Sequence, residues 1–309
     1  MTPRRPPSAR HTANDGFIVI AVLWILGALA VLAAIYSVFV VDTAAAVASH
    51  KDRVQAEALV TAGIELTAHR ITAVPEQRPS NGGFTFRLGS ASVIVRFVSE
   101  TARIDLNTAP KELLVGLFAS LGALREAEYY ADRIIGWRTS PADRQNDETA
   151  AYRTAGMHYA PRGGMFPHVG ELWLVMGLPE ALIERALPHL TVHSGQAQVS
   201  ILDASPQVLG ALPGMSPERL HDVLAARATA PQNAQYLLSL LGPAQTHATA
   251  EPAKAFRVTV QVVLDNGRRI RSEVVILVAE EDAEPYRVLS WADDVDESAG
   301  AARTRASTR

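Results

Sequence analysis

The sequence has no cysteine among its 309 residues, and this absence excludes disulfide frameworks, thiolate metal sites and cysteine nucleophiles. It also lacks a nucleophile elbow, a phosphate-binding glycine-rich loop that ends in Lys-Ser or Lys-Thr, and a helix with two histidines beside a glutamate. No constellation of catalytic residues is recognisable. The sequence therefore predicts a protein that is not an enzyme.

A basic surface is also missing. The formal net charge is -3, and no lysine occurs between Lys111 and Lys254. Without a global positive field, a nucleic-acid partner is not favoured. With 48% hydrophobic and 20% charged residues, the chain is long enough for a membrane anchor plus one elaborate or two modest globular domains.

Charge is absent altogether from Phe17 to Val41. A helix of roughly 25 residues, rising about 1.5 Å per residue, crosses the roughly 30 Å hydrocarbon core of a bilayer. The preceding arm carries Arg4, Arg5 and Arg10 against Asp15 alone. Because positive arms stay on the cytoplasmic side, we expect a cytoplasmic N-terminus and an exported C-terminal region.

The apolar run has three possible interpretations. A cleaved secretory signal is disfavoured by length, since signal h-regions run about 7 to 15 residues. The junction Asp15-Gly16-Phe17 resembles the site of prepilin peptidase, which cleaves between glycine and an aromatic residue; cleavage between Gly16 and Phe17 would keep the helix. From this segment alone, an ordinary single-pass anchor and a pilin-type helix are equally supported.

The helical pattern continues beyond the apolar run to Ile71, and Pro75 is the first strong breaker. Apolar residues recur there at intervals typical of an amphipathic helix: Val54, Ala58, Ile64, Ala68 and Ile71. Extended runs follow at Phe84–Leu88 and Ser92–Ser99, then again at Phe256–Leu264, Arg269–Ala279 and Tyr286–Trp291. Asn266-Gly267 predicts a type I′ hairpin turn.

The interval between the two groups of strands is helical, with glycine and proline punctuation. The sequence thus predicts an α+β fold: a long N-terminal helix packs on a small antiparallel sheet, and a large all-helical domain of repeated helix-turn-helix units is inserted between strands. The expected domains are a basic leader (1–16), the helix (17–74), the first part of the sheet (75–102), the insert (103–249), the second part of the sheet (250–292) and a disordered tail (293–309).

Two features of the insert suggest ligands. The Leu-Pro-Gly turn at 212–215 resembles a helix-hairpin-helix turn, which binds DNA phosphate. With such a turn the chain would be a membrane-anchored DNA-binding protein. Phosphate binding requires positive charge beside the turn, however, and here Glu218, Asp222 and Asp203 offset Arg219. A packing turn between helices is the favoured interpretation.

The second feature is an acidic loop that carries Asp143, Asp147 and Glu148. Clustered carboxylates suit Ca²⁺, a hard ion that takes 6 to 8 oxygen ligands, although the spacing is not that of an EF-hand. The alternative is a solvated loop whose charges balance Arg138 and Arg144.

Several motifs, in this order, resemble the K-type minor pseudopilins of the type II secretion system. They are Val22-Leu23-Trp24, the segment Ala56–Glu65, Arg103–Ala109, Ile134–Arg138, Phe166–Leu172, Pro188–Val192 and the Leu-Pro-Gly turn. The resemblance implies a pilin-like fold whose inserted domain consists of helix-hairpin-helix or SAM-like units. It also implies a single-pass protein of the bacterial inner membrane with a periplasmic head, matured by prepilin peptidase. It further implies a cap that initiates the periplasmic pseudopilus for protein export, bound to I-type and J-type minor pseudopilins and the inner-membrane secretion platform.

The resemblance also gives meaning to individual residues. In most pilin-like subunits the fifth mature residue is a glutamate that pairs with a neighbouring N-terminal ammonium, but here that position is Ala21. A subunit without this carboxylate is poorly suited to repeated insertion in the shaft and better suited to a cap. K-type proteins are associated with calcium in the helical domain, which favours the acidic loop. Thr139-Ser140 and Thr149-Ala150-Ala151 nevertheless depart from the family's acidic pattern.

Overall fold

The computed structural model describes residues 15–73, 78–140, 142, 148–230, 233–279 and 284–295. The chain divides into two compact units, Met1–Glu57 and Ala58–Arg309. The basic arm with Arg4, Arg5 and Arg10 lies outside the described residues, as does the predicted disordered tail from residue 296 onward.

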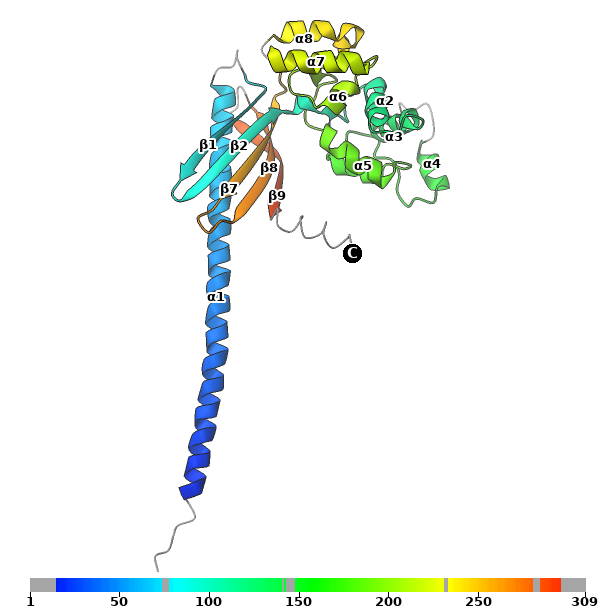
Figure 1. The fold of residues 1–309 in the computed structure, drawn as a ribbon. Helices are drawn as coiled ribbons and strands as arrows, with labels where there is room; N and C mark the ends of the chain where they lie inside the picture. Colours follow the sequence, from blue (N-terminus) through cyan, green and yellow to red (C-terminus); the bar gives the residue numbers. More distant parts are fainter. Residues whose placement is uncertain are drawn as a thin grey trace, which may run out of the picture. The chain divides into compact units, whose positions relative to one another are not determined.

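Helix α1 (Asp15–Thr72) is the longest element, at 58 residues, and it begins in the first unit and ends in the second (Figure 1). Its length confirms the prediction of one uninterrupted N-terminal helix. The helix ends shortly before Pro75, because proline disfavours helical backbone in the residue that precedes it.

The second unit contains a five-stranded antiparallel sheet in the order β1-β2-β7-β8-β9. The strands are β1 (Asn81–Leu88), β2 (Ala91–Ser99), β7 (Ala255–Val263), β8 (Arg269–Val278) and β9 (Tyr286–Val295). All five correspond to predicted extended runs, and β9 reaches beyond the predicted end of the sheet at residue 292. Hydrophobic alternation explains this success, since every second residue of β2 and β7 is buried.

One face of the sheet packs against the last turns of α1. The core between them contains Leu59, Val60, Ile64, Ala68 and Ile71 from the helix and Val95, Phe97, Val258, Val260 and Val274 from the strands. Gly63 permits this close approach, because a Cβ at that position would lie 3.2 Å from methyl groups of Val95 and Val260.

The predicted helical stripe was wrong at its first two positions. Val54 and Ala58 are exposed, whereas Leu59 and Val60 are buried. Apolar spacing alone could not tell the buried from the exposed positions, because the apolar residues before and after Glu57 fit a period of 3.6 residues equally well. The prediction was right for Ile64, Ala68 and Ile71.

The turn between β7 and β8 also differs from the prediction. The Gly267 N–H donates to the Leu264 carbonyl at 3.0 Å, so Asp265 and Asn266 occupy the central positions of the turn. Gly267 follows with φ +79°, a left-handed conformation that glycine adopts without strain. This is a three-residue loop with a glycine bulge, in place of the predicted two-residue type I′ turn.

The segment between β2 and β7 forms the predicted insert, and it confirms the α+β fold class. Its helices are α2 (Lys111–Ser120), α3 (Ala127–Arg138), α4 (Glu148–Thr154), α5 (Glu180–Ala186), α6 (Pro206–Gly210), α7 (Pro217–Thr229) and α8 (Ala234–Leu240). Short 3₁₀ turns occur at Glu100–Ala102, Val169–Leu174, Leu187–His189 and Gly242–His247.

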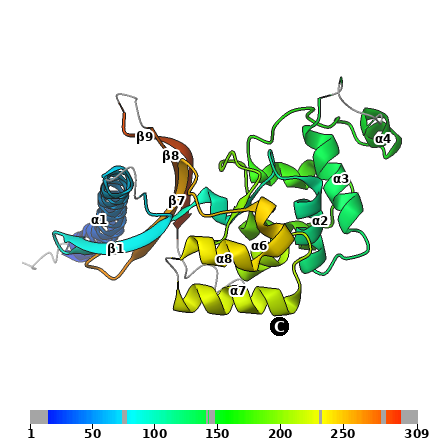
Figure 2. The same ribbon diagram turned by 90° about the horizontal axis from the view of Figure 1, so that it is seen from above.

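Two short strand pairs, which the sequence analysis did not predict, divide the insert into similar halves. The parallel pair β3 (Ile104–Asp105) and β4 (Leu190–Thr191) brackets α2 to α5, and the parallel pair β5 (Val199–Ser200) and β6 (Ala248–Thr249) brackets α6 to α8. Figure 2 shows α2 beside α3, and α7 beside α8. Strands of two residues carry no periodic signal, so no sequence pattern reveals them.

Candidate membrane anchor and assembly site

The first half of α1 presents an apolar surface. Val19–Val40 is long and apolar enough to cross a membrane, and it is the single segment of this kind among the described residues. Its large side chains are exposed, up to 77% for Trp24. Ser37 donates its hydroxyl proton to the Ala33 carbonyl at 2.8 Å, so it needs no water. Such a surface would favour aggregation in water, whereas a bilayer would cover it.

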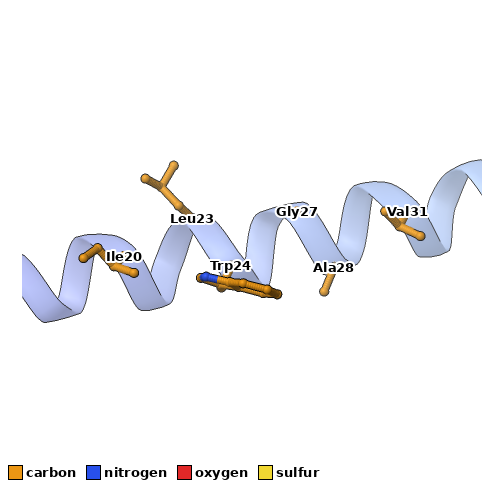
Figure 3. A pocket seen from close by; sticks show the side chains of 6 residues that line it. All are labelled: Ile20, Leu23, Trp24, Gly27, Ala28 and Val31. Atoms are coloured by element: carbon orange, nitrogen blue, oxygen red, sulfur yellow. The ribbon is translucent and has the colours of Figure 1, made fainter.

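This half of the helix also has a shaped groove of about 670 Å³, lined by Ile20, Leu23, Trp24, Gly27, Ala28 and Val31 (Figure 3). The groove arises because Gly27 and Ala28 lie beside the much larger Trp24 and Val31. A Cβ placed at Gly27 would have no neighbouring atom within 4 Å, so the space beside this residue is open. The surface can therefore receive a lipid chain or a neighbouring apolar helix.

The predicted maturation residues lie at the start of this helix. Gly16 and Phe17 belong to α1, but their side chains lie outside the described residues. Ala21 is partly exposed on the same helix. Cleavage between Gly16 and Phe17 and the consequence of the missing glutamate at Ala21 stay predictions.

Of the predicted calcium ligands, only Glu148 lies within the described residues; Asp143 and Asp147 lie outside them. Glu148 is 5% exposed and begins α4. Its carboxylate forms an ion pair with Arg133 of α3 at 3.0 Å. Across the described part of the chain, no three His, Asp or Glu side chains are grouped as a metal site would require. For Glu148 to bind calcium, it would have to share its carboxylate with Arg133.

The Leu-Pro-Gly turn joins α6 to α7. Gly214 has φ +72°, and Ser205 and Ser216 cap the two helices by accepting hydrogen bonds from the Val208 and Arg219 N–H groups. The nearest cation is engaged, because the Arg219 guanidinium donates to the Gly214 carbonyl at 3.0 Å. The geometry is that of the packing turn favoured by the sequence.

Three of the motifs that carried the family resemblance, Arg103–Ala109, Ile134–Arg138 and Phe166–Leu172, meet in the first half of the insert. Asn107 exchanges two hydrogen bonds with the Phe166 backbone, at 3.0 and 2.7 Å. The Trp137 indole N–H donates to the Glu171 carboxylate at 3.2 Å, and Arg162 pairs with the same carboxylate. These residues hold loops in place.

A guanidinium closes the turn before the first helix in each half of the insert. Arg138 of α3 donates to the Leu106 and Ala109 carbonyls, the latter at 2.6 Å. Arg227 of α7 donates to the Ala204 carbonyl at 2.7 Å and to the Leu202 carbonyl at 3.3 Å. The two halves thus share one structural device, which the sequence analysis missed because the arginines lie more than 20 residues from their acceptors.

Glu100 connects the sheet to the insert. It follows β2 directly, its side chain is fully buried, and it accepts hydrogen bonds from Arg257 of β7, at 2.8 Å from Nε, and from the Thr191 hydroxyl of β4. Burial acts to raise the pKa of Glu100, but the hydrogen bond and charge of Arg257 and the Thr191 hydroxyl outweigh it, so the pKa lies below its usual value.

Comparison with known proteins agrees with this architecture. Residues 95–195 match the family model described as type II secretion system (T2SS), protein K. Among solved structures, the chain is similar to a chain in the crystal structure of the GspK-GspI-GspJ complex from enterotoxigenic Escherichia coli, with 16% identity and a TM-score of 0.56. The match covers 80% of this chain and 99% of that one. A search of curated proteins finds no match.

An apolar N-terminal helix that continues into a helix-on-sheet core gives a pilin-like fold, and its apolar half fits a single-pass anchor. At this level of identity the solved structure supports the fold, and the family match covers the first half of the insert, where the motif residues meet. Both findings agree with the resemblance to K-type minor pseudopilins that the sequence motifs carry.

Proposed function

We propose that the chain is a K-type minor pseudopilin that caps the tip of the periplasmic pseudopilus and initiates its assembly for protein export. The observation that carries the proposal is the construction of α1: its apolar half has no carboxylate at Ala21 or anywhere in Val19–Val40, and its other half is fixed to a large head. Shaft subunits repeat along a fibre, and a head with a long insert would crowd its neighbours at each repeat. A single terminal position avoids this crowding.

The partners follow from the same proposal. The similar solved structure is a complex of GspK with GspI and GspJ. We expect this chain to bind the corresponding I-type and J-type minor pseudopilins, to contact the inner-membrane secretion platform and to be a substrate of prepilin peptidase. The chain is then a structural component of the inner membrane, with a cytoplasmic N-terminus and a periplasmic head, and it catalyses no reaction.

Mass spectrometry of the protein extracted from membranes tests the maturation step. The expected N-terminal residue is Phe17, with or without N-methylation, because cleavage after Gly16 leaves the apolar helix in place. Replacement of Gly16 by a bulkier residue should leave the full-length chain. Any other mature N-terminus would remove prepilin processing from the proposal.

Co-expression tests the partners. The full chain should co-purify in mild detergent with I-type and J-type minor pseudopilins of the same system. Two results would favour the alternative, a membrane-anchored DNA-binding protein. One is a head located on the cytoplasmic side of the membrane, and the other is tight, salt-sensitive binding of duplex DNA by the full chain.

A further inference from the structure

The face of the sheet that points away from α1 carries a groove of about 610 Å³. Side chains alternate along the strands, so Val95 and Phe97 of β2 enter the core with α1 while Arg96 between them points to the opposite face. The groove is lined by Asn81, Gly82 and Gly83 of β1, by Arg96, Phe97 and Val98 of β2, and by Arg103, Arg257, Thr259, Arg271 and Glu273.

Positive charge dominates this groove. Four of its lining residues are arginines and one is a glutamate, in a chain whose formal net charge is -3. Two of the arginines are compensated: Arg257 pairs with Glu100 and Glu273, and Arg103 lies 3.6 Å from Glu100. These contacts leave two positive charges in excess.

The excess charges belong to Arg96 and Arg271. Both are exposed, and no side chain within the described part of the chain lies at hydrogen-bond or ion-pair distance from either. They belong to adjacent rows of the sheet, since Thr259 of β7 is the register partner of Arg96 and Gln261 is that of Arg271. Asp294 of β9, whose side chain lies outside the described residues, is the other register partner of Arg271, so Arg96 is the clearer probe.

Exposed guanidinium groups select carboxylates, because their parallel N–H donors match the two oxygens of a carboxylate. Two such groups in adjacent rows of a sheet suit a ligand with more than one carboxylate. A single small anion would satisfy only one of them.

The other wall of the groove favours a polypeptide ligand. It is formed by β1, which is an edge strand with a single neighbour, β2, among the described strands. Gly83, the register partner of Arg96, adds no side chain to the groove face, whereas the Phe97 ring lies where a Cβ of Gly82 would be. An extended chain can therefore approach this edge closely.

We propose that this groove binds an extended, carboxylate-bearing segment of a partner protein, held by Arg96 and Arg271 alongside the Gly82-Gly83 edge. The inference is separate from the proposed function, because its test measures the binding of a peptide and not pseudopilus assembly.

The test uses the full chain in uncharged detergent and a fluorescein-labelled octapeptide of alternating Glu and Val, whose carboxylates share one face when extended. Fluorescence anisotropy should show binding at about 50 mM NaCl that weakens at about 300 mM, where charges are screened more strongly. The parent chain should bind the same peptide with Gln in place of Glu at least about 10-fold more weakly than the Glu peptide. The Arg96→Glu variant should bind the Glu peptide at least about 10-fold more weakly than the parent chain does. Arg96→Gln should give a smaller loss of the same sign.

Arg87→Glu is the matched control, because Arg87 is exposed on β1 outside the groove and its replacement changes the net charge equally. Its affinity should stay within about 2-fold of the parent, since a distant charge is screened. Equal losses in Arg87→Glu and Arg96→Glu, or equal binding of the Glu and Gln peptides, would overturn the proposal. Binding of glycerol phosphate at this groove without binding of the peptide would overturn it in favour of a lipid headgroup.

Discussion

At the scale of single residues, Glu100 is the most constrained group in the head. It leaves the sheet at the end of β2 and contacts both the sheet, through Arg257, and the insert, through Thr191. A buried carboxylate of this kind is tolerable only while its partners remain, because an uncompensated buried charge is strongly unfavourable. Glu100 therefore couples the packing of the insert to that of the sheet.

The Glu100 carboxylate should make the stability of the head depend on pH. Its pKa in the folded protein is below the ordinary value of about 4.3, so its contribution is complete above that value and is lost as the pH falls through the lower folded pKa. Thermal unfolding of the parent chain should thus weaken below about pH 4.3. In Glu100→Gln this part of the pH dependence should disappear; an unchanged acid profile would show that Glu100 is not the responsible group.

Removal of the partner of Glu100 should have a larger effect. Arg257→Met leaves the carboxylate buried without its main cation, which is expected to lower the free energy of unfolding by about 3–5 kcal/mol. Chemical denaturation of the full chain in detergent measures this loss. Arg87→Met, at an exposed position of β1, should change it by less than about 0.5 kcal/mol.

Arg138 should be sensitive to a substitution that keeps its charge. Its two terminal nitrogens donate to two carbonyls, and lysine cannot reproduce this fork. Arg138→Lys should lower the free energy of unfolding by about 1–3 kcal/mol, because at least one partly buried carbonyl loses its donor. Arg153→Lys, in α4, is a charge-matched comparison, and an equal effect of the two substitutions would contradict the assigned role of Arg138.

At the scale of elements, the sequence predicted those with strong periodicity. The whole of α1 and all five strands of the sheet were predictable, because an apolar run of this length and alternating β-branched residues have few other solutions. The two-residue strands of the insert and the loop at Asp265–Gly267 were not, since hydrogen bonds between distant segments and one glycine conformation determine them.

The corrected register of α1 gives a paired prediction. Ile64 is 1% exposed in the core with the sheet, so Ile64→Asp should cost at least about 4 kcal/mol of unfolding free energy, by loss of apolar burial and by burial of a charge. Ala58 is exposed, and Ala58→Asp should cost less than about 0.5 kcal/mol. Thermal unfolding of both variants, followed by circular dichroism, tests this register. A large loss of stability in both variants would support the predicted register, in which both positions were buried.

The acidic loop gives a prediction about calcium. If the loop binds Ca²⁺ as proposed from its composition, Ca²⁺ should raise the melting temperature of the full chain, and the double variant Asp143→Asn, Asp147→Asn should lose the increase. Glu148 is a poor probe, because its removal would also leave Arg133 without an ion-pair partner. Equal melting temperatures in Ca²⁺ and in a chelator would show that the loop is a solvated one.

At the scale of the whole molecule, the candidate site was predictable in kind but not in detail. The anchor, the absence of a carboxylate at Ala21 and the large insert can be inferred from the sequence because each depends on residue type and length. The contacts of Glu100 and the groove at Arg96 depend on residues more than 150 positions apart, such as Glu100 and Arg257, that only folding brings together.

Labelling of isolated pseudopili tests the central claim most directly. Because the chain has no cysteine, a single one introduced at Leu124, which is 77% exposed, can carry a maleimide-linked gold particle without competing sites. If the protein is the cap, electron microscopy should show gold at one end of each fibre. Gold distributed along the length of the fibres would contradict the cap.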